Sequence, residues 1–316
     1  MLFKKMKGRR LLILLAGCVL IIALFLCLWE CNRMPEIVEQ LHSYKELSTQ
    51  WRKIKAFKKR KGVALVVHGL NLKPERMDDI IICLNKIGID VLNVSLRGHG
   101  SNYRANKNIP EAEARLDSFR TVDYKLWLQE VRNGYDIAKK RARRKNVPLY
   151  FAGYSLGGLL GCDLFLSNPE NSFDGMILFA PALSVKTEAY LLKTMMPFPN
   201  LVIDSLSPPY YRSNNGTPMA AYKALFEAID YFEKNINQQL NRPTLLFIDE
   251  DDEFISADSI RDMITKYKLD QWRLCHVRKD PETGGNISHH LIIDPDSVGK
   301  KMWKQITDGI AHNLRE

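Results

Sequence analysis

Short, nearly continuous apolar runs recur along most of the chain, and glycine, proline or polar residues separate them. The runs lie in Val63–Leu70, Ile89–Gly100, Val147–Ser155, Met176–Leu183, Thr244–Asp249 and Trp272–Val277. An apolar run of roughly four to eight residues is typical of a β-strand that is buried on both faces. The pattern therefore predicts a sheet whose two faces are both covered.

Between these runs, apolar residues recur three or four positions apart, which is the spacing of an amphipathic helix. The stretches with this spacing are 74–88, 121–146, 156–166, 257–267 and 298–313. Strands that alternate with helices form a mostly parallel, doubly wound sheet with helices on both faces. The sequence therefore predicts an α/β fold, whose ligands bind at the carboxyl ends of the strands.

Residues 184–241 interrupt this alternation. They are rich in aromatic residues, methionine and proline, as in LLKTMMPFP and SPPYYRSNNG. We expect a helical insertion that forms a cap over the carboxyl edge of the sheet. The alternative is an ordinary pair of surface helices.

The first residues carry a strong membrane signal. Five Lys/Arg lie in residues 1–10, and Leu11–Trp29 is a run of 19 residues without a charge. A helix of that length spans the apolar core of a bilayer. We expect residues 1–32 to form an uncleaved signal anchor, a transmembrane helix. A bacterial lipoprotein box ending at Cys18 is the alternative, although the apolar run continues well beyond that cysteine.

The formal charge of +10 is confined to the same end of the chain. Residues 1–62 contain 14 Lys/Arg and 4 Glu, which leaves 32 basic and 32 acidic residues in the neutral body from residue 63 onward. A neutral body argues against nucleic acid as a partner and favours a membrane-facing leader. We expect residues 33–62 to be a basic juxtamembrane segment.

The bias of basic residues around the apolar run predicts the orientation of the chain. More of them precede the run than closely follow it, which places the body on the non-cytoplasmic side. The basic stretch Trp51–Gly62 would reverse that balance if it counted fully. The six cysteines form no Cys-x-x-Cys pair, so neither a zinc ribbon nor a disulfide framework is expected.

The sequence Gly153-Tyr154-Ser155-Leu156-Gly157 lies where an apolar strand meets an apolar helix. A Gly-x-Ser-x-Gly match alone is weak, since about 0.1 matches occur by chance in a chain of this length. The strand–turn–helix context is the one that a nucleophilic serine requires, and the two glycines give the tight turn the space it needs. The backbone N–H groups of Leu156 and of Leu70, in the turn after the first strand, are candidate oxyanion donors.

A serine nucleophile needs a base and an acid that orients the base. His289 and His290 follow the last strand in a polar loop, which gives the chain order serine, acid, histidine. The candidate acids lie at the end of the strand Thr244–Asp249 and just after it: Asp249, Glu250, Asp251, Asp252 and Glu253.

These pieces together resemble the α/β-hydrolase family, and within it the branch of monoacylglycerol lipases and lysophospholipases. The resemblance covers residues 63–316 and rests on VALVVHGL, LRGHG, GYSLGG, the segment from Pro243 through FIDEDDEFIS, and SHHLIID. The family pattern implies Asp252 as the acid, nine residues after Pro243, and it favours His289 over His290 because His289 lies five residues before Asp294. Ser95 and Asn102 depart from the family turn, in which aspartate and serine are common.

The resemblance implies a membrane-anchored serine hydrolase that cleaves carboxylic esters, in particular lipid or long-chain acyl esters. Ser155, His289 and Asp252 would form an acyl-enzyme, without a metal or other cofactor. The alternatives are a membrane-tethered interaction protein on an inert hydrolase scaffold, and a serine peptidase or thioesterase of the same fold.

Overall fold

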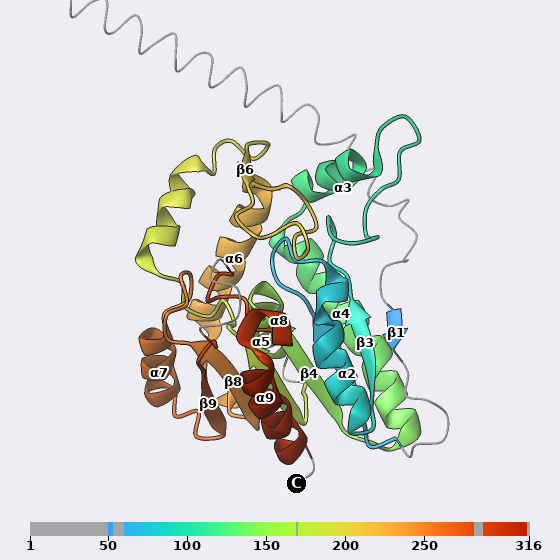
Figure 1. Ribbon diagram of the computed structural model, residues 1–316, viewed down its shortest axis with the longest axis vertical. Helices are drawn as coiled ribbons and strands as arrows, with labels where there is room; N and C mark the ends of the chain where they lie inside the picture. Colours follow the sequence, from blue (N-terminus) through green and yellow to red (C-terminus); the bar gives the residue numbers. More distant parts are fainter. Residues whose placement is uncertain (1–49, 53–59, 169, 281–286, 315–316) are drawn as a thin grey trace, which may run out of the picture. The chain divides into compact units, whose positions relative to one another are not determined.

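The computed structural model describes residues 50–52, 60–168, 170–280 and 287–314, and within them a seven-stranded sheet (Figure 1). In spatial order its strands are β1 (Gln50–Arg52), β3 (Ile89–Val94), β2 (Gly62–Val67), β4 (Leu149–Tyr154), β5 (Gly175–Phe179), β8 (Thr244–Asp249) and β9 (Trp272–Val277). The strands from β3 to β9 are parallel to one another, whereas β1 is antiparallel to β3. The sheet is therefore mostly parallel, as predicted.

Strand β2 shows why the apolar runs are nearly continuous. Val63, Leu65 and Val67 face one hydrophobic core, and Ala64 and Val66 face the other. All five side chains are fully buried. A strand between two helical layers has no face that can carry polar side chains, so its sequence loses the polar alternation of an exposed sheet.

Helices cover both faces of the sheet. On one face, α4 (Tyr124–Lys145), α5 (Leu156–Ser167) and α7 (Ala257–Lys266) contribute buried residues to the larger core. On the other face, α2 (Asp78–Lys86), α8 (Pro295–Val298) and α9 (Lys300–Asn313) enclose the second core. Of these helices, α2, α4, α7 and α9 lie within stretches that the apolar spacing predicted, and α5 extends one residue beyond its stretch.

Local signals set the ends of the longest helix, α4. The Asp123 side chain accepts a hydrogen bond from the Leu126 N–H at 2.7 Å, which caps the first turn. Three basic residues, Arg143–Lys145, occupy the last turn, where they complement the negative end of the helix dipole. The helix ends at Asn146, whose φ of 50° terminates it in the left-handed conformation.

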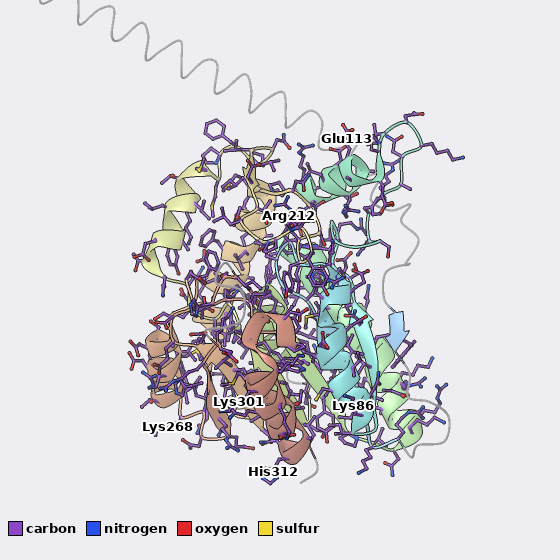
Figure 2. All side chains as sticks on the ribbon, viewed as in Figure 1. Lys86, Glu113, Arg212, Lys268, Lys301 and His312 are labelled. Atoms are coloured by element: carbon purple, nitrogen blue, oxygen red, sulfur yellow. The ribbon has the colours of Figure 1, made fainter. Side chains whose placement is uncertain are left out.

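The insertion is less helical than expected. It contains the short 3-10 helices η2 (Thr187–Met195) and η3 (Gln238–Leu240), an antiparallel pair of strands β6 (Val202–Asp204) and β7 (Gly216–Pro218), and one long helix, α6 (Met219–Asn235). Figure 1 shows β6 and the upper part of α6 at the carboxyl end of the sheet. Arg212 of the insertion and Glu113 of α3 (Glu111–Arg120) lie at that end, whereas Lys86 and His312 lie toward the other (Figure 2).

Hydrogen bonds join the start and the middle of the insertion to loops at the carboxyl edge of the sheet. At its start, the Lys186 N–H donates to the Phe254 carbonyl at 2.8 Å. Near its middle, the Ser213 N–H donates to the Asn71 carbonyl at 2.8 Å, and the Asn71 side-chain oxygen accepts from the Asn214 N–H at 2.9 Å. The insertion is therefore anchored beside the loops that follow β8 and β2.

The predicted localisation is contradicted by this structure. Among the residues that the structure describes, no helix has both the length and the apolar character needed to cross a bilayer. The expected span Leu11–Trp29 and the alternative lipid anchor at Cys18 lie outside the described residues, as does most of the basic segment 33–62. The prediction of a membrane-anchored protein with its body on the non-cytoplasmic side is withdrawn.

Candidate active site

Ser155 lies between β4 and α5 in a strained backbone conformation. Its φ of 51° and ψ of −117° are unusual for a residue with a side chain, and such a conformation costs about 1–3 kcal/mol. Hydrogen bonds hold it there: the Ser155 N–H donates to the Phe179 carbonyl at 2.9 Å, and the Ala182 N–H donates to the Ser155 carbonyl at 3.1 Å. The turn presents the side chain at the carboxyl end of the sheet.

The glycines on either side of Ser155 are required by space. A Cβ on Gly153 would lie 2.6 Å from the backbone nitrogen of Gly158. A Cβ on Gly157 would overlap the carbonyl oxygen of Val67 and lie 2.6 Å from that of His68. Both contacts are with backbone atoms, which cannot rotate away, so the turn excludes any larger residue at these positions.

A continuous chain of hydrogen bonds reaches Ser155 through a histidine. His290 Nε2 lies 2.9 Å from Ser155 Oγ, and His290 Nδ1 lies 2.8 Å from Asp252 Oδ2. Asp252 is fully buried, and its other oxygen accepts the N–H groups of Phe254 at 2.8 Å and Ile255 at 2.9 Å. A carboxylate that accepts at Nδ1 holds the proton there, which leaves Nε2 free to accept from the serine.

The preference for His289 is therefore corrected, because His290 occupies the position between Ser155 and Asp252. His289 turns toward Asp249, with Nδ1 2.9 Å from Asp249 Oδ2, and its side chain is 42% exposed. The two histidines share one turn, closed by the Leu291 N–H on the Ser288 carbonyl at 3.0 Å. Adjacent side chains of this turn point to different partners, so only one of them reaches the serine.

Aromatic rings enclose the His290 imidazole. The Tyr154 ring centroid lies 5.2 Å from that of His290, and the Phe254 ring meets the imidazole edge-on at 5.3 Å. Tyr154 is buried, whereas the Phe254 side chain is 46% exposed. The imidazole is thus held between a residue of the core and an apolar residue at the surface.

The candidate oxyanion donors flank the serine. Leu156 is the first residue of α5, and Leu70 follows β2 in a turn packed against Ser155, where a Cβ on Gly69 would lie 3.2 Å from the Ser155 Cβ. The fully buried His68 holds this turn: its Nδ1 lies 2.8 Å from the Gly69 carbonyl, and the Leu96 N–H donates to its Nε2 at 3.0 Å.

Two buried histidines of the glycine turns have a structural rather than a catalytic part. Burial lowers the pKa of His68 to about 4, and burial also lowers the pKa of His99 well below its usual value. Both rings are therefore neutral near pH 7, and each can accept a backbone hydrogen bond. His99 Nε2 accepts the Asn71 N–H at 2.9 Å, which fixes the residue after Leu70.

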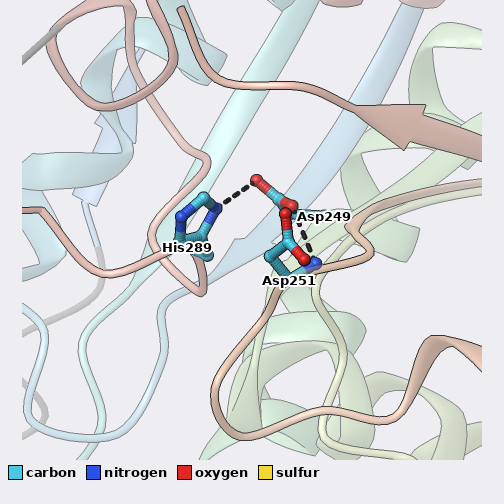
Figure 3. A group of neighbouring side chains, drawn as sticks. All are labelled: Asp249, Asp251 and His289. Atoms are coloured by element: carbon cyan, nitrogen blue, oxygen red, sulfur yellow. Dashed lines mark hydrogen bonds and ion pairs between the residues drawn. The ribbon is translucent and has the colours of Figure 1, made fainter. Parts of the chain in front are cut away.

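Asp249, Asp251 and His289 form a second cluster beside the triad-like group (Figure 3). Their candidate ligand atoms lie within 4.8 Å of one another, a spacing that could hold a metal ion. Hydrogen bonds already engage both oxygens of Asp249, one to His289 at 2.9 Å and the other to the Asp251 N–H at 3.0 Å. These bonds account for the cluster as a support of the histidine loop.

Some residues of the site carried no specific signal in the sequence. The Lys186 ammonium donates to the Asp252 carbonyl, a contact between residues far apart in the chain. Glu253 was one of five candidate acids, but it contacts the histidine loop rather than an imidazole. The sequence does not predict the path of a polar loop, so it gives no basis for choosing such hydrogen-bond partners.

A strained serine turn after a central strand of a mostly parallel sheet, with a histidine and a buried aspartate within reach, defines the class of α/β-hydrolases. The family model described as Hydrolase_4 (serine aminopeptidase, S33) matches residues 58–223, which is more than half of the chain. The chain belongs to this family. No curated protein sequence matches the chain significantly.

Solved structures share the fold at low sequence identity. A soluble variant of a monoglyceride lipase from Saccharomyces cerevisiae, in complex with a substrate analog, superimposes with a TM-score of 0.65 at 14% identity, covering 84% of this chain and 90% of that one. The monoacylglycerol lipase of Paleococcus ferrophilus gives 0.58 at 16% identity, covering 85% and 100%. A thermostable carboxyl esterase from Bacillus coagulans gives 0.54 at 12%, covering 85% and 99%. These likenesses concern the fold.

Proposed function

We propose that the protein is a serine hydrolase that cleaves carboxylic esters, with Ser155 as nucleophile, His290 as base and Asp252 as orienting acid. The observation that carries the proposal is the continuous hydrogen-bonded chain from Asp252 through His290 to Ser155, with distances of 2.8 and 2.9 Å. The membership of the chain in a hydrolase family supports it.

In this mechanism, Ser155 Oγ attacks the acyl carbonyl carbon while His290 Nε2 accepts the hydroxyl proton. Asp252 keeps the proton on Nδ1 and stabilises the imidazolium that forms. His290 then donates a proton to the leaving alcohol. Water, deprotonated by the same imidazole, releases the acid from the acyl-enzyme.

The oxyanion of the tetrahedral intermediate needs fixed donors. We assign them to the N–H groups of Leu156 and Leu70. The first lies at the N-terminus of α5, where the N–H groups have no intrahelical partner and the helix dipole is positive. The second lies in the turn that His68 and His99 hold. Both N–H donors are therefore already in fixed positions before a substrate binds.

The exposed apolar side chains of the insertion support an apolar acyl group as the substrate. Most of the exposed large apolar side chains of the described residues belong to the insertion: Leu191, Met195, Phe198, Leu201, Leu206 and Tyr210. Phe254, which contacts the His290 ring, is exposed as well. We therefore extend the proposal to long-chain acyl esters such as monoacylglycerols or lysophospholipids.

A fluorophosphonate probe and a panel of esters test this function. Wild-type protein should be labelled at Ser155 and should hydrolyse p-nitrophenyl esters, and Ser155→Ala should lose labelling and at least about 10³-fold in kcat. Absence of labelling in the wild type would identify an inert scaffold.

The substrate class has its own test. Activity should rise with acyl chain length and extend to monoacylglycerols. Turnover of acetyl and butyryl esters alone would exclude the long-chain assignment, and turnover of aminoacyl anilides in preference to esters would indicate a peptidase.

A further inference from the structure

The loop after β8 supplies a carboxylate to each of the two histidines in the turn 288–290. Asp249, at the end of β8, pairs with His289, and Asp252 pairs with His290. Glu253, the next residue, contacts neither imidazole. Its carboxylate instead accepts hydrogen bonds from backbone N–H groups and from the serine hydroxyl of the turn 288–290.

The hydrogen bonds to Glu253 use both of its oxygens. Oε2 accepts the Ser288 hydroxyl at 2.6 Å and the His290 N–H at 3.0 Å, and Oε1 accepts the His289 N–H at 2.8 Å. Successive N–H groups that converge on one anion form a nest, which binds a carboxylate through its charge and its shape. The contact ties the loop after β8 to the loop after β9 next to the imidazole that meets Ser155.

The charge of Glu253 is matched to this role. Partial burial by itself would raise the pKa of the Glu253 carboxyl, but the hydrogen bonds from Ser288, His289 and His290 outweigh it and lower that pKa to about 2. The carboxylate is therefore ionised at neutral pH, where it carries a negative charge. The Lys279 ammonium donates to the Ser288 carbonyl at 2.5 Å, so the turn is held by an anion at its N–H groups and by a lysine at a carbonyl.

The adjacent histidines make the position of this main chain decisive. A small slip of the turn would move His290 out of reach of Ser155, and a displacement of about 1 Å in a catalytic group can cost roughly 10²-fold in rate. Side-chain pairing with Asp252 orients the ring of His290 but leaves its backbone free to shift. The Glu253 carboxylate restricts that shift by accepting the His290 N–H at 3.0 Å, beside the Ser288 hydroxyl, which accepts it at 3.3 Å.

We propose that Glu253 is a positioning residue of this site: its carboxylate fixes the main chain of the turn 288–290, so that His290 rather than His289 meets Ser155. This inference rests on the proposed function. It concerns the placement of the base and not the chemistry of the serine.

Two glutamates of the same loop provide a matched test. Glu253→Gln replaces an anion that accepts three hydrogen bonds with an amide that cannot accept them all. Glu250→Gln makes the same replacement at an exposed residue, whose partners are His276 at 3.1 Å and Arg261 at 3.6 Å, away from the histidine turn. Both full-length variants and the wild type are assayed for p-nitrophenyl ester hydrolysis, for the rate constant of fluorophosphonate labelling and for thermal midpoint.

We expect Glu253→Gln to lower kcat and the labelling rate constant together, by roughly 10- to 100-fold, with KM nearly unchanged. Glu250→Gln should match the wild type in all three. Equal kinetics of the two variants would refute the positioning role, as would a loss confined to KM. If the wild type itself is neither labelled nor active, the proposed function fails instead, so the two failures are distinguishable.

Ser288→Ala provides a second route, because it leaves Glu253 in place and removes the hydroxyl that donates to Glu253 and accepts the His290 N–H at 3.3 Å. It should lower kcat in the same direction by a smaller factor. The double variant should be little slower than Glu253→Gln alone, since Glu253 and the Ser288 hydroxyl contact each other and share the His290 N–H. Full additivity of the two losses, or an unchanged kcat in Ser288→Ala where Glu253→Gln does not fold, would overturn the inference.

Discussion

At the scale of single residues, the two neighbouring histidines should differ sharply in their contribution to activity. His290→Ala removes the group 2.9 Å from Ser155 Oγ and should lower kcat at least about 10³-fold. His289→Ala removes a half-exposed ring that pairs with Asp249 and should keep most of the activity. Steady-state hydrolysis of a p-nitrophenyl ester measures both. The reverse ranking would restore His289 as the base.

The same pair shows what the sequence could and could not specify. Ser155 directly follows strand β4, where the apolar pattern fixes the position of the residue on the sheet edge, whereas Asp252 lies three residues beyond β8 and was chosen among five acids only through the family resemblance. The histidines lie in a turn, which has no periodicity, and their direction depends on hydrogen bonds to Glu253 and Asp249 from another loop. The chain order narrowed the choice to this pair, and the spacing of the family pattern then favoured His289, the residue that does not contact Ser155.

At the scale of elements, the turn from β4 to α5 should tolerate no added methyl group, whereas another helical glycine should. Gly157→Ala places a Cβ onto the carbonyls of Val67 and His68, and a forced backbone shift of this kind costs about 1–3 kcal/mol or more. Gly309→Ala in α9 meets nothing within 4 Å and should stabilise the fold by about 0.5–1 kcal/mol. Urea unfolding of both variants measures the difference, and a stable Gly157→Ala would show that the turn is not tight.

Elements with strong apolar patterns were predictable, and those without were not. Strand β1 lies in a basic stretch and is itself the edge strand of the sheet, paired with β3, so it has no apolar run of its own. Helix α3 buries only Ala114, Ser118 and Phe119, and its largely polar sequence gives little amphipathic signal. The insertion was expected to be helical, but its strands β6 and β7 are three residues each, too short to show a period.

At the scale of the whole molecule, alternating runs and helices were enough to predict the mostly parallel sheet, because burial on two faces makes every central strand nearly continuously apolar. A buried carboxyl in one of the covering helices produces no such pattern in the sequence. Asp163 of α5 is fully buried, and neither of its oxygens has a partner at normal hydrogen-bond distance among the described residues. The Tyr124 hydroxyl is a polar group that interacts with it.

This carboxyl should make the stability of the whole domain depend on pH. Burial raises the pKa of Asp163 well above its usual value, and the interaction with Tyr124 opposes the shift only in part. In the unfolded chain the same carboxyl ionises near pH 4, so the folded state holds the extra proton above that pH. The contribution of Asp163 is therefore complete below about pH 4 and is lost as the pH rises toward the raised folded pKa, by up to about 1.4 kcal/mol per pH unit.

Asp163→Asn removes this proton linkage, and Asp136→Asn, at an exposed position of α4, is its control. The free energy of unfolding of Asp163→Asn is measured by urea denaturation from pH 4 to pH 8. We expect it to increase steadily relative to that of the wild type as the pH rises. Its value at pH 4 can lie below the wild type, because the amide introduces a buried N–H₂ group, so the slope decides and not the offset. The control should run parallel to the wild type. Parallel curves for Asp163→Asn as well would mean that Asp163 is already ionised in the folded protein, held by a partner in the core between α4, α5 and α6.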